Sequence, residues 1–372
     1  MKLHDRAHSA ISPTPAYSLG RDYLLWIFVA ALVVLSVLVP PKISDYFTLV
    51  DWPTIAALLG LMMIAKGVEL SGGLHRAAQA IAARVVSERR LALFLVAGSG
   101  LAAMLLTNDI VLFVVVPLTL ELGEYAALPL RRLVIFEALA VNAGAMLTPI
   151  GNPQNIFLWQ HSGVGFGVFV AHMFVPFVIA EACLLALTAA AFPGRCVVMD
   201  QAGAKADVNR RTLVTSVLLF APFLVLADWG YTAAALALVA GVFVFRSPRL
   251  LRRVDWPLIA VFILMFIDLG LLARYRPLAA FDLASPENVY IAGALVSQVV
   301  SNVPAAILLA ARSADWTAIA WGVNVGAFGL VIASFASLIA LRLGHQRGSY
   351  LAFHAWSLPF FFVVGTLTWL WI

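Results

Sequence analysis

Long runs of apolar residues dominate the chain, and polar residues come in short groups between them. The runs Tyr23–Pro40, Phe166–Phe192 and Leu351–Ile372 each have about the length that a helix needs to cross a bilayer. Several other runs are shorter and are interrupted by small polar groups. This pattern predicts an all-α polytopic membrane protein.

One polar group, Thr107–Asp109, separates the apolar half-segments Leu91–Leu106 and Ile110–Leu122. Each half is shorter than the roughly 20 residues that a crossing needs. Basic pairs lie outside both halves, at Arg89-Arg90 and Arg131-Arg132, so the chain returns to the side that it left. A re-entrant helical hairpin explains this pattern best, and two short full crossings are the alternative.

A second interruption follows the basic pair Arg131-Arg132. The segment Thr148-Pro149-Ile150-Gly151-Asn152-Pro153-Gln154-Asn155 cannot sustain a helical hydrogen-bond ladder, because prolines lack the N–H donor. The helix resumes at Ile156. Near the other end of the chain, Val331–Ser337 has neither Pro nor Gly, so there a kink is the alternative to a break, with Ser334 and Ser337 bonding back to the backbone.

Three matches relate the two halves of the chain in the same order. They join Val50–Ala56 to Val254–Ala260 (254 − 50 = 204), Thr107-Asn108 to Ser301-Asn302 (301 − 107 = 194), and Val141–Ala145 to Val323–Ala327 (323 − 141 = 182). We interpret them as a duplicated unit. The predicted parts are a cytoplasmic tail at 1–22, a first transmembrane helix at 23–44, a first repeat at 45–192 with hairpin 91–122 and broken helix 131–160, a cytoplasmic loop at 193–211, linking transmembrane helices at 212–248, and a second repeat at 249–372 with hairpin 289–312 and kinked or broken helix 316–343.

Composition and charge strengthen the membrane assignment and orient the chain. Of the 372 residues 63% are hydrophobic and 12% charged, whereas soluble domains are nearer half apolar and a quarter charged. Cytoplasmic loops carry an excess of Lys and Arg, which explains the net charge of +5 without a nucleic-acid partner. With a cytoplasmic N-terminus, only Lys42, Arg274, Arg276 and Arg312 of the 24 basic residues fall outside. The two repeats then have inverted topology.

The tips and breaks are the predicted binding site. A half-helix that begins inside the membrane aims unpaired N–H groups and a partial positive charge at a cavity, and such ends attract anions. Asn108 and Asn302, which can both donate and accept, are expected to contact the solute or ion from opposite sides, or else only to cap their half-helices. The predicted site residues are Thr107, Asn108, Asp109, Asn142, Thr148, Pro149, Gly151, Asn152, Asn155, Ser301, Asn302, Asn324, Ser334 and Ser337.

Asp109 is the candidate for the coupling ion, a proton or sodium. An ionisable group at bilayer depth is costly and is a functional hypothesis by default, with capping of the half-helix as the alternative. Glu137 is expected to pair with Arg132, and Asp268 is expected to have a buried polar partner, with a functional role as the alternative. The sequence contains no Cys/His cluster, so no metal or cofactor other than the coupling ion is expected.

The motifs Leu105–Asp109, Thr148–Asn155 and Gln298–Pro304 resemble those of the ion transporter superfamily, which includes citrate transporters, arsenite permeases and divalent anion:sodium symporters. The chain looks most similar to the short YbiR-type anion transporters, over residues 23–372. The resemblance implies helix-hairpin repeats, two Asn-containing tips around one substrate, elevator-like movement and a homodimer. The sodium-coupled symporters carry Ser-Asn-Thr-like tips, whereas Asp109 and Val303 stand here, which argues against two symmetric sodium sites.

The expected function is secondary transport of a small anion, oxyanion or carboxylate across a bacterial inner membrane. The solute and membrane lipids are the expected partners. Because no Lys or Arg lies in a tip or a break, export of a neutral oxyacid such as arsenite stays open. An intramembrane enzyme acting on a lipid-linked substrate is a further alternative, although it would need ionisable groups that converge at one membrane face.

Overall fold

The computed structural model describes residues 23–40, 42–50, 52–73, 76, 80, 87–196, 208–228, 230–273 and 283–372. Within these residues the regular structure is helical, and the β contact is an isolated bridge between Ser87 and Cys196. Helices α9 and α18 are each long and apolar enough to cross a membrane. The helices are α1 (Tyr23–Leu38), α2 (Ile43–Leu49), α3 (Trp52–Leu70), α5 (Glu88–Leu105), α6 (Asn108–Leu122), α7 (Leu130–Ala145), α8 (Pro153–Ser162), α9 (Phe166–Ala191), α10 (Arg210–Asp228), α11 (Thr232–Arg246), α12 (Pro248–Leu251), α13 (Trp256–Ala273), α14 (Pro286–Val300), α15 (Asn302–Ala310), α16 (Trp316–Gly326), the 3₁₀ turn η3 (Val331–Ala333), α17 (Phe335–Gly344) and α18 (Ser349–Trp369).

Some predicted features lie outside the described residues. They include the tail at 1–22, much of the loop at 193–211, and two of the basic residues assigned to the outside, Arg274 and Arg276. The prediction of a cytoplasmic tail and loop therefore stays a prediction.

The helices form two compact units, and each unit takes segments from both halves of the chain. Unit 1 comprises Met1–Lys66 and Leu219–Leu271, and unit 2 comprises Gly67–Leu218 and Leu272–Ile372. Helices α3, α10 and α13 continue from one unit into the other. The two units therefore do not coincide with the first and second repeats predicted from the sequence.

Within unit 1, the two copies of Val-Asp-Trp-Pro begin α3 and α13. Trp52 donates its indole N–H to the Phe47 carbonyl at 3.0 Å, and Trp256 donates to the Leu251 carbonyl at 3.1 Å. In each copy the donor reaches five residues back into a short helix, α2 or α12. The sequence match between the two copies thus corresponds to the same local fold.

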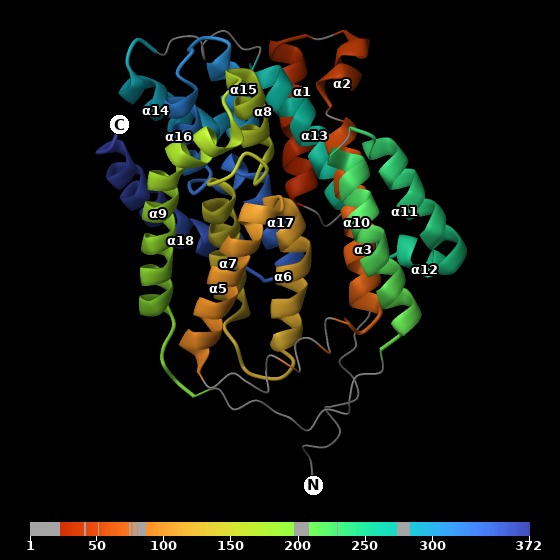
Figure 1. Ribbon diagram of the computed structural model, residues 1–372. Helices are drawn as coiled ribbons and strands as arrows, with labels where there is room; N and C mark the ends of the chain where they lie inside the picture. Colours follow the sequence, from red (N-terminus) through yellow and green to blue (C-terminus); the bar gives the residue numbers. More distant parts are fainter. Residues whose placement is uncertain are drawn as a thin grey trace. The chain divides into compact units, whose positions relative to one another are not determined.

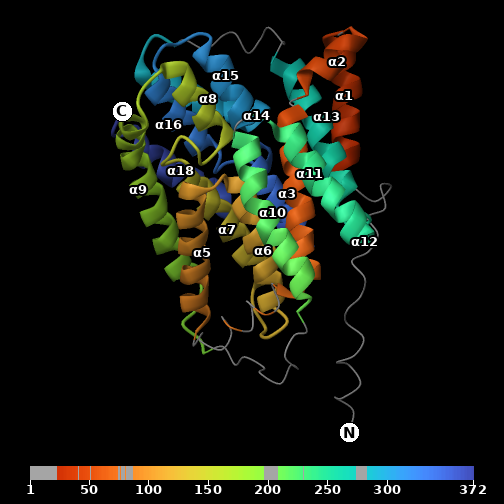
Figure 2. The ribbon, with the colours of Figure 1, turned by 45° about the vertical axis from the view of Figure 1, so that its right-hand side comes forward.

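Unit 2 contains two helical hairpins and two broken helices. Leu106 and Thr107 join α5 to α6, and Ser301 joins α14 to α15. The first broken helix is α7 and α8, and the second is α16 and α17. In both views the α5–α6 hairpin opens toward the lower end of this unit and the α14–α15 hairpin toward its upper end (Figures 1 and 2).

The packing within unit 2 is reciprocal. Each hairpin packs its first helix on the first part of its own broken helix, α5 on α7 and α14 on α16. Each packs its second helix on the second part of the other broken helix, α6 on α17 and α15 on α8. Glycines permit close approach: a Cβ on Gly144 would collide with the Gly100 backbone, and one on Gly326 would come within 2.7 Å of the Ser297 Cβ.

One boundary prediction is corrected, and one open alternative is decided. Helix α6 begins at Asn108 rather than Ile110, with Thr107 as its N-cap residue. The second helix is broken rather than kinked, because α16 ends at Gly326 and α17 begins at Phe335. The break starts at Ala327, several residues before the segment that the sequence pattern marked, and it includes Gly329.

Candidate functional site

Asn142, in the middle of unit 2, joins the first hairpin tip to the second break. Its side-chain amide accepts from Asn108 Nδ2 at 3.3 Å and from Ser334 Oγ at 2.9 Å, and it donates to Ser337 Oγ at 3.2 Å. All four residues are buried. Ser334 and Ser337 therefore bind Asn142 rather than the backbone of their own helix, which sets aside the alternative of a kink.

Asn324 makes the corresponding contacts with the first break. Its Oδ1 accepts from Asn152 Nδ2 at 2.9 Å and from Gln154 Nε2 at 3.4 Å, and its Nδ2 donates to Asn155 Oδ1 at 2.7 Å. Asn152 also caps α8 by accepting from the backbone N–H of Asn155. The amide of Asn324 thus holds the start of α8.

The two sets of contacts follow one rule. Asn324 is the counterpart of Asn142 in the match that joins Val141–Ala145 to Val323–Ala327. Ser334 and Ser337, which bind Asn142, also correspond to Asn152 and Asn155, which bind Asn324. Both correspondences have the offset of that match (334 − 152 = 182 and 337 − 155 = 182). Each broken helix therefore contributes an asparagine that crosses to the break of the other. We call these asparagines, with the tip and break residues that they bond, the polar network.

Each tip also contacts the break of its own half. The backbone N–H of Asn108 donates to the Gly151 carbonyl at 2.9 Å, and Ser301 Oγ donates to the Ala333 carbonyl at 3.4 Å. Gly151 and Ala333 are separated by the same offset as the two asparagines of the broken helices. Ser301 has a φ of 70° and a ψ of 160°, so a non-glycine residue adopts a backbone conformation that is almost restricted to glycine at the second tip.

Four helices begin at the tips and breaks, namely α6, α8, α15 and α17. The N-cap side chains Thr107, Ser301 and Ser334 make no capping hydrogen bond, whereas Asn152 does. Helix starts carry unpaired N–H groups and a partial positive charge. The arrangement therefore offers positive potential without a basic side chain, since the sequence has no Lys or Arg in the tips and breaks.

Two oxygens beside the first tip and break lack partners. Asp109 is the second residue of α6, and its Oδ1 is buried with no hydrogen-bond partner among the described residues. The Oε1 atom of Gln154, in the first turn of α8, is also buried and unpartnered within the part of the chain that the structure describes. Asp109 does not cap α6, because Thr107 holds that position. Unpaired buried oxygens are places where a proton, a cation or a solute donor would bind.

Residues 20–340 match the citrate transporter family. The inner membrane protein YbiR of Escherichia coli strain K12 is 39% identical over 348 residues, which cover 92% of this chain and 93% of YbiR. An uncharacterized transporter of Methanocaldococcus jannaschii is 31% identical over 329 residues, 87% of this chain and 89% of that protein. The chain belongs to the citrate transporter family.

A more distant similarity is confined to part of the chain. The silicon efflux transporter LSI3 of Oryza sativa subsp. japonica is 28% identical over 127 residues, 34% of this chain and 26% of that protein. Membership of the citrate transporter family makes this chain a multi-pass membrane transporter, in agreement with the predicted resemblance. The alternative of an intramembrane enzyme is therefore set aside.

The structure distributes the predicted site residues of this transporter unevenly. The two asparagines of the broken helices, the four predicted residues that bind them across the halves and Asn108 make up two hydrogen-bonded sets, one around Asn142 and one around Asn324. Thr148 donates its hydroxyl to the Met104 carbonyl at 2.9 Å, which ties the first break to α5. Asn302 is buried but contacts its neighbour Ser301 at 3.4 Å rather than Asn142 or Asn324. That Asn108 and Asn302 face each other across a solute stays a prediction.

Sequence reasoning missed the residues that support the second break. Gln298 on α14 donates to the Ala294 and Gly326 carbonyls and accepts from the Leu330 N–H at 2.7 Å. On α18, His354 Nε2 accepts from the Val331 N–H at 3.2 Å, and Ser357 donates to the Gly329 carbonyl at 2.8 Å. The sequence shows His354 only as a lone histidine in an apolar span, so nothing in the pattern identified this contact.

The predicted pairing of Glu137 with Arg132 is wrong, and no partner of Asp268 is found among the described residues. Glu137 does not pair with Arg132, which donates instead to the Ala191 carbonyl at 2.6 Å and lies over the rings of Phe192 and Trp356. Glu137 accepts from the hydroxyl of Thr119 on α6. Both side-chain oxygens of Asp268 are buried without a hydrogen-bond partner among the described residues.

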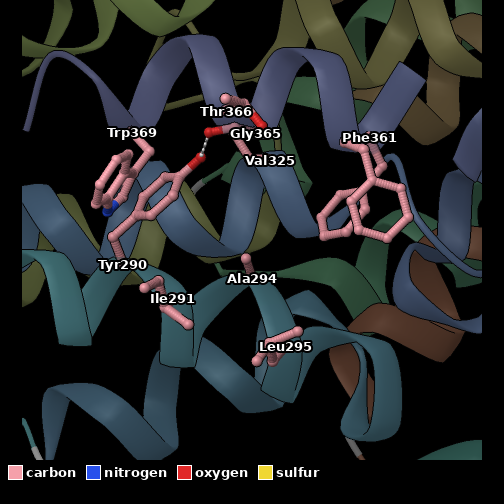
Figure 3. A pocket seen from close by; sticks show the side chains of 10 residues that line it. Tyr290, Ile291, Ala294, Leu295, Val325, Phe361, Gly365, Thr366 and Trp369 are labelled. Atoms are coloured by element: carbon pink, nitrogen blue, oxygen red, sulfur yellow. Dashed lines mark hydrogen bonds between the residues drawn. The ribbon is translucent and has the colours of Figure 1, made fainter. Parts of the chain in front are cut away.

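A separate apolar pocket of about 220 Å³ lies between α14, α16 and α18. Tyr290 and Trp369 face each other near one end, and Phe361 lies at the other (Figure 3). The Tyr290 hydroxyl donates to the Gly365 carbonyl and is hydrogen-bonded to the Thr368 hydroxyl. No residue of the polar network lines this pocket, so its apolar surface does not form part of the candidate solute site.

Proposed function

We propose that this chain is a secondary active transporter of a small anion, oxyanion or carboxylate, driven by a proton or sodium gradient. The reciprocal polar network carries the proposal. It joins amides and hydroxyls at the starts of three helices, α6, α8 and α17, and the start of α15 is tied to the second break by the bond from Ser301 to the Ala333 carbonyl. Non-helical backbone at membrane depth is tolerated only where protein or a water-filled cavity surrounds it, as at transporter binding sites.

We propose further that the two halves are inverted repeats with re-entrant hairpins. The constant offset between corresponding residues of the network, the reciprocal helix packing and the opposed openings of the two hairpins support this topology (Figures 1 and 2). The network lies wholly within unit 2, while unit 1 contains α11 and the second part of α10, which are linking helices. This division supports elevator-type alternating access, in which unit 2 moves as the carrier. The proposed location is the inner membrane of a bacterium, with a cytoplasmic N-terminus, as a homodimer.

Asp109 supplies a physical reason for coupling. An ionised carboxylate in the second position of α6 repels an anion from the same helix start, because both charges act in a low-dielectric region. A proton or a sodium ion bound to the unpartnered Oδ1 removes this repulsion. Anion binding then depends on prior binding of the cation, which is the requirement for symport.

A neutral oxyacid is the second candidate solute. Two observations favour it: no basic side chain lies in the tips or breaks, and the chain is similar over part of its length to a silicon efflux transporter. Amides and hydroxyls can donate to and accept from an undissociated acid without a fixed cationic partner. For such a solute, Asp109 would couple export to the movement of a proton in the opposite direction.

The test is uptake into vesicles of phosphatidylethanolamine and phosphatidylglycerol that contain the purified full chain. Citrate, succinate, sulfate, phosphate and arsenite are offered under an imposed proton gradient and then under a sodium gradient. Saturable uptake of one solute under one gradient identifies the solute class and the coupling ion together. Folded protein that neither accumulates nor exchanges any of the five contradicts the proposal for this set.

The Asp109→Asn variant tests the coupling role in the same vesicles. The amide keeps the shape of the carboxyl group but holds neither charge nor transported proton. We expect gradient-driven uptake to fall roughly tenfold while solute exchange without a gradient persists, because the repulsion is permanently absent. Wild-type dependence on pH and sodium in this variant would leave Asp109 with a structural role.

A further inference from the structure

Glu137 is a second buried carboxyl group in unit 2, away from the tips. Its side chain is 0% exposed in the middle of α7. One oxygen accepts from Thr119 on α6, and the other, Oε2, is buried without a partner among the described residues. A buried polar atom without a partner in a folded protein calls for an explanation, such as an unseen proton, ion or water.

Helices α5, α6, α9, α17 and α18 pack against α7. The titratable or charged side chains of α7 and these helices are Glu88, Arg89, Arg90, Asp109, Glu121, Arg131, Arg132, His172, Glu181, Cys183, Arg342, Tyr350 and His354. None of these described side chains forms a hydrogen bond or an ion pair with Glu137. An unpaired buried charge costs several kcal/mol, so the carboxyl group at this position is neutral and carries a proton.

The position of Glu137 relates it to the polar network. It precedes Asn142 on α7 by five residues, about 7.5 Å of helix rise. Its partner Thr119 lies on α6, the helix that begins with Asn108 and Asp109. The same two helices are therefore joined twice, by Asn108 with Asn142 at the tip and by Thr119 with Glu137 nearer the start of α7. In the orientation proposed above, the start of α7 faces the cytoplasm.

We propose that Glu137 and Thr119 form a proton-binding site between the polar network and the cytoplasmic end of α7, which gains and loses its proton as unit 2 changes state. This inference rests on the proposed transport function and adds to it a second proton-binding group besides Asp109. Release of the proton leaves a charge that the closed packing of α6 on α7 cannot solvate. Deprotonation is therefore linked to separation of these helices, and protonation to their closure.

The first experiment detects the bound proton itself, so it does not require the transported solute to be known. Infrared spectra of the full chain in phosphatidylethanolamine–phosphatidylglycerol vesicles are compared between wild type and Glu137→Gln, which keeps an acceptor for Thr119. We expect a carbonyl band of a protonated carboxylic acid at neutral pH in the wild type and its loss in the variant. Glu124→Gln, at an exposed carboxylate just after α6, is the matched control and keeps the band. Identical bands in wild type and Glu137→Gln overturn the proposal.

Thr119 provides a second variant that keeps the carboxyl group. Thr119→Val removes the hydroxyl donor and shifts the band, and Thr119→Ser restores it. A band that does not respond to Thr119→Val contradicts the assignment to this pair.

The second arm asks whether the proton moves during transport, with citrate and arsenite as the solutes. In Glu137→Gln we expect proton-driven uptake to fall roughly tenfold relative to exchange without a gradient. An infrared band that disappears with Glu137→Gln, combined with unchanged proton-driven uptake, shows a static buried acid and overturns the proposed linkage. If neither solute is transported by the wild type, the proposed function fails for these solutes, and the infrared arm still decides whether Glu137 binds a proton.

Discussion

The two breaks of unit 2 occupy corresponding positions but are stabilised differently. The first is held largely from within: Asn155 Nδ2 donates to the carbonyls of Ala145, Met146 and Thr148 at 3.1–3.2 Å. The second has no such residue, because Ser337 stands at the position of Asn155. Its backbone is instead bonded by side chains of two neighbouring helices, Gln298 of α14 and the α18 residues His354 and Ser357.

Two breaks at corresponding positions can thus be stabilised by different sets of hydrogen bonds. A short serine can accept from Asn142 but cannot reach three carbonyls of its own break. The second break therefore depends on the packing of α14 and α18, while the first depends mainly on its own sequence. If α18 shifts relative to α16 and α17 during transport, the second break changes with it.

The largest effect is expected where the close helix packing of the two halves differs. A Cβ on Gly144 collides with the backbone of Gly100, which cannot move aside without displacing α5, whereas a Cβ on Gly326 meets the Ser297 side chain and the Ala294 carbonyl. We expect Gly144→Ala to destabilise unit 2 by about 3 kcal/mol or more, and Gly326→Ala by less. Thermal unfolding of the purified protein in detergent measures both changes.

The control for this comparison is Gly98→Ala, on the same helix as Gly100 but with no atom within 4 Å of the added Cβ. That substitution should leave stability unchanged or raise it slightly, since alanine favours the helix. Equal losses for Gly144→Ala and Gly326→Ala would mean that the two crossings are equivalent.

A smaller effect is expected from the two corresponding break residues. Asn155→Ala removes the donor to three carbonyls and one of the two acceptors of the Asn324 Nδ2 group, which keeps its bond to the Ala320 carbonyl, so we expect a loss of about 2–3 kcal/mol. Ser337→Ala removes the acceptor of the Asn142 Nδ2 group, while Asn142 Oδ1 still accepts from Ser334, so about 1 kcal/mol is expected for this single lost bond. Thermal unfolding again gives the ranking, and a larger loss for Ser337→Ala would reverse the contrast between the breaks.

The sequence predicted the parts of this fold that rest on backbone chemistry. Prolines and glycine marked the first break, and the polar tip between two short apolar halves marked the first hairpin. The sequence left the second segment open as a break or a kink, because its backbone is supported by residues distant in sequence. Gln298 stood out only as part of the motif Gln298–Pro304, and His354 only as a lone histidine in an apolar span. Glu137 was misassigned for a similar reason. Arg132 was the nearest opposite charge along the chain, but Thr119 on another helix became the partner.

The smallest loss of stability is expected from removing the hydrogen bond between α18 and the second break. His354 accepts from the Val331 N–H, so His354→Phe leaves that donor buried and unpaired at a cost of about 1 kcal/mol. We expect faster amide hydrogen exchange at residues 327–334 and unchanged exchange at residues 146–152, because Asn155 holds the first break independently of α18. His172→Phe, at an exposed histidine whose ring nitrogen bonds within α9, is the control. Equal exchange at both breaks in His354→Phe would mean that the second break does not depend on this contact, and Gln298 alone would then distinguish it from the first.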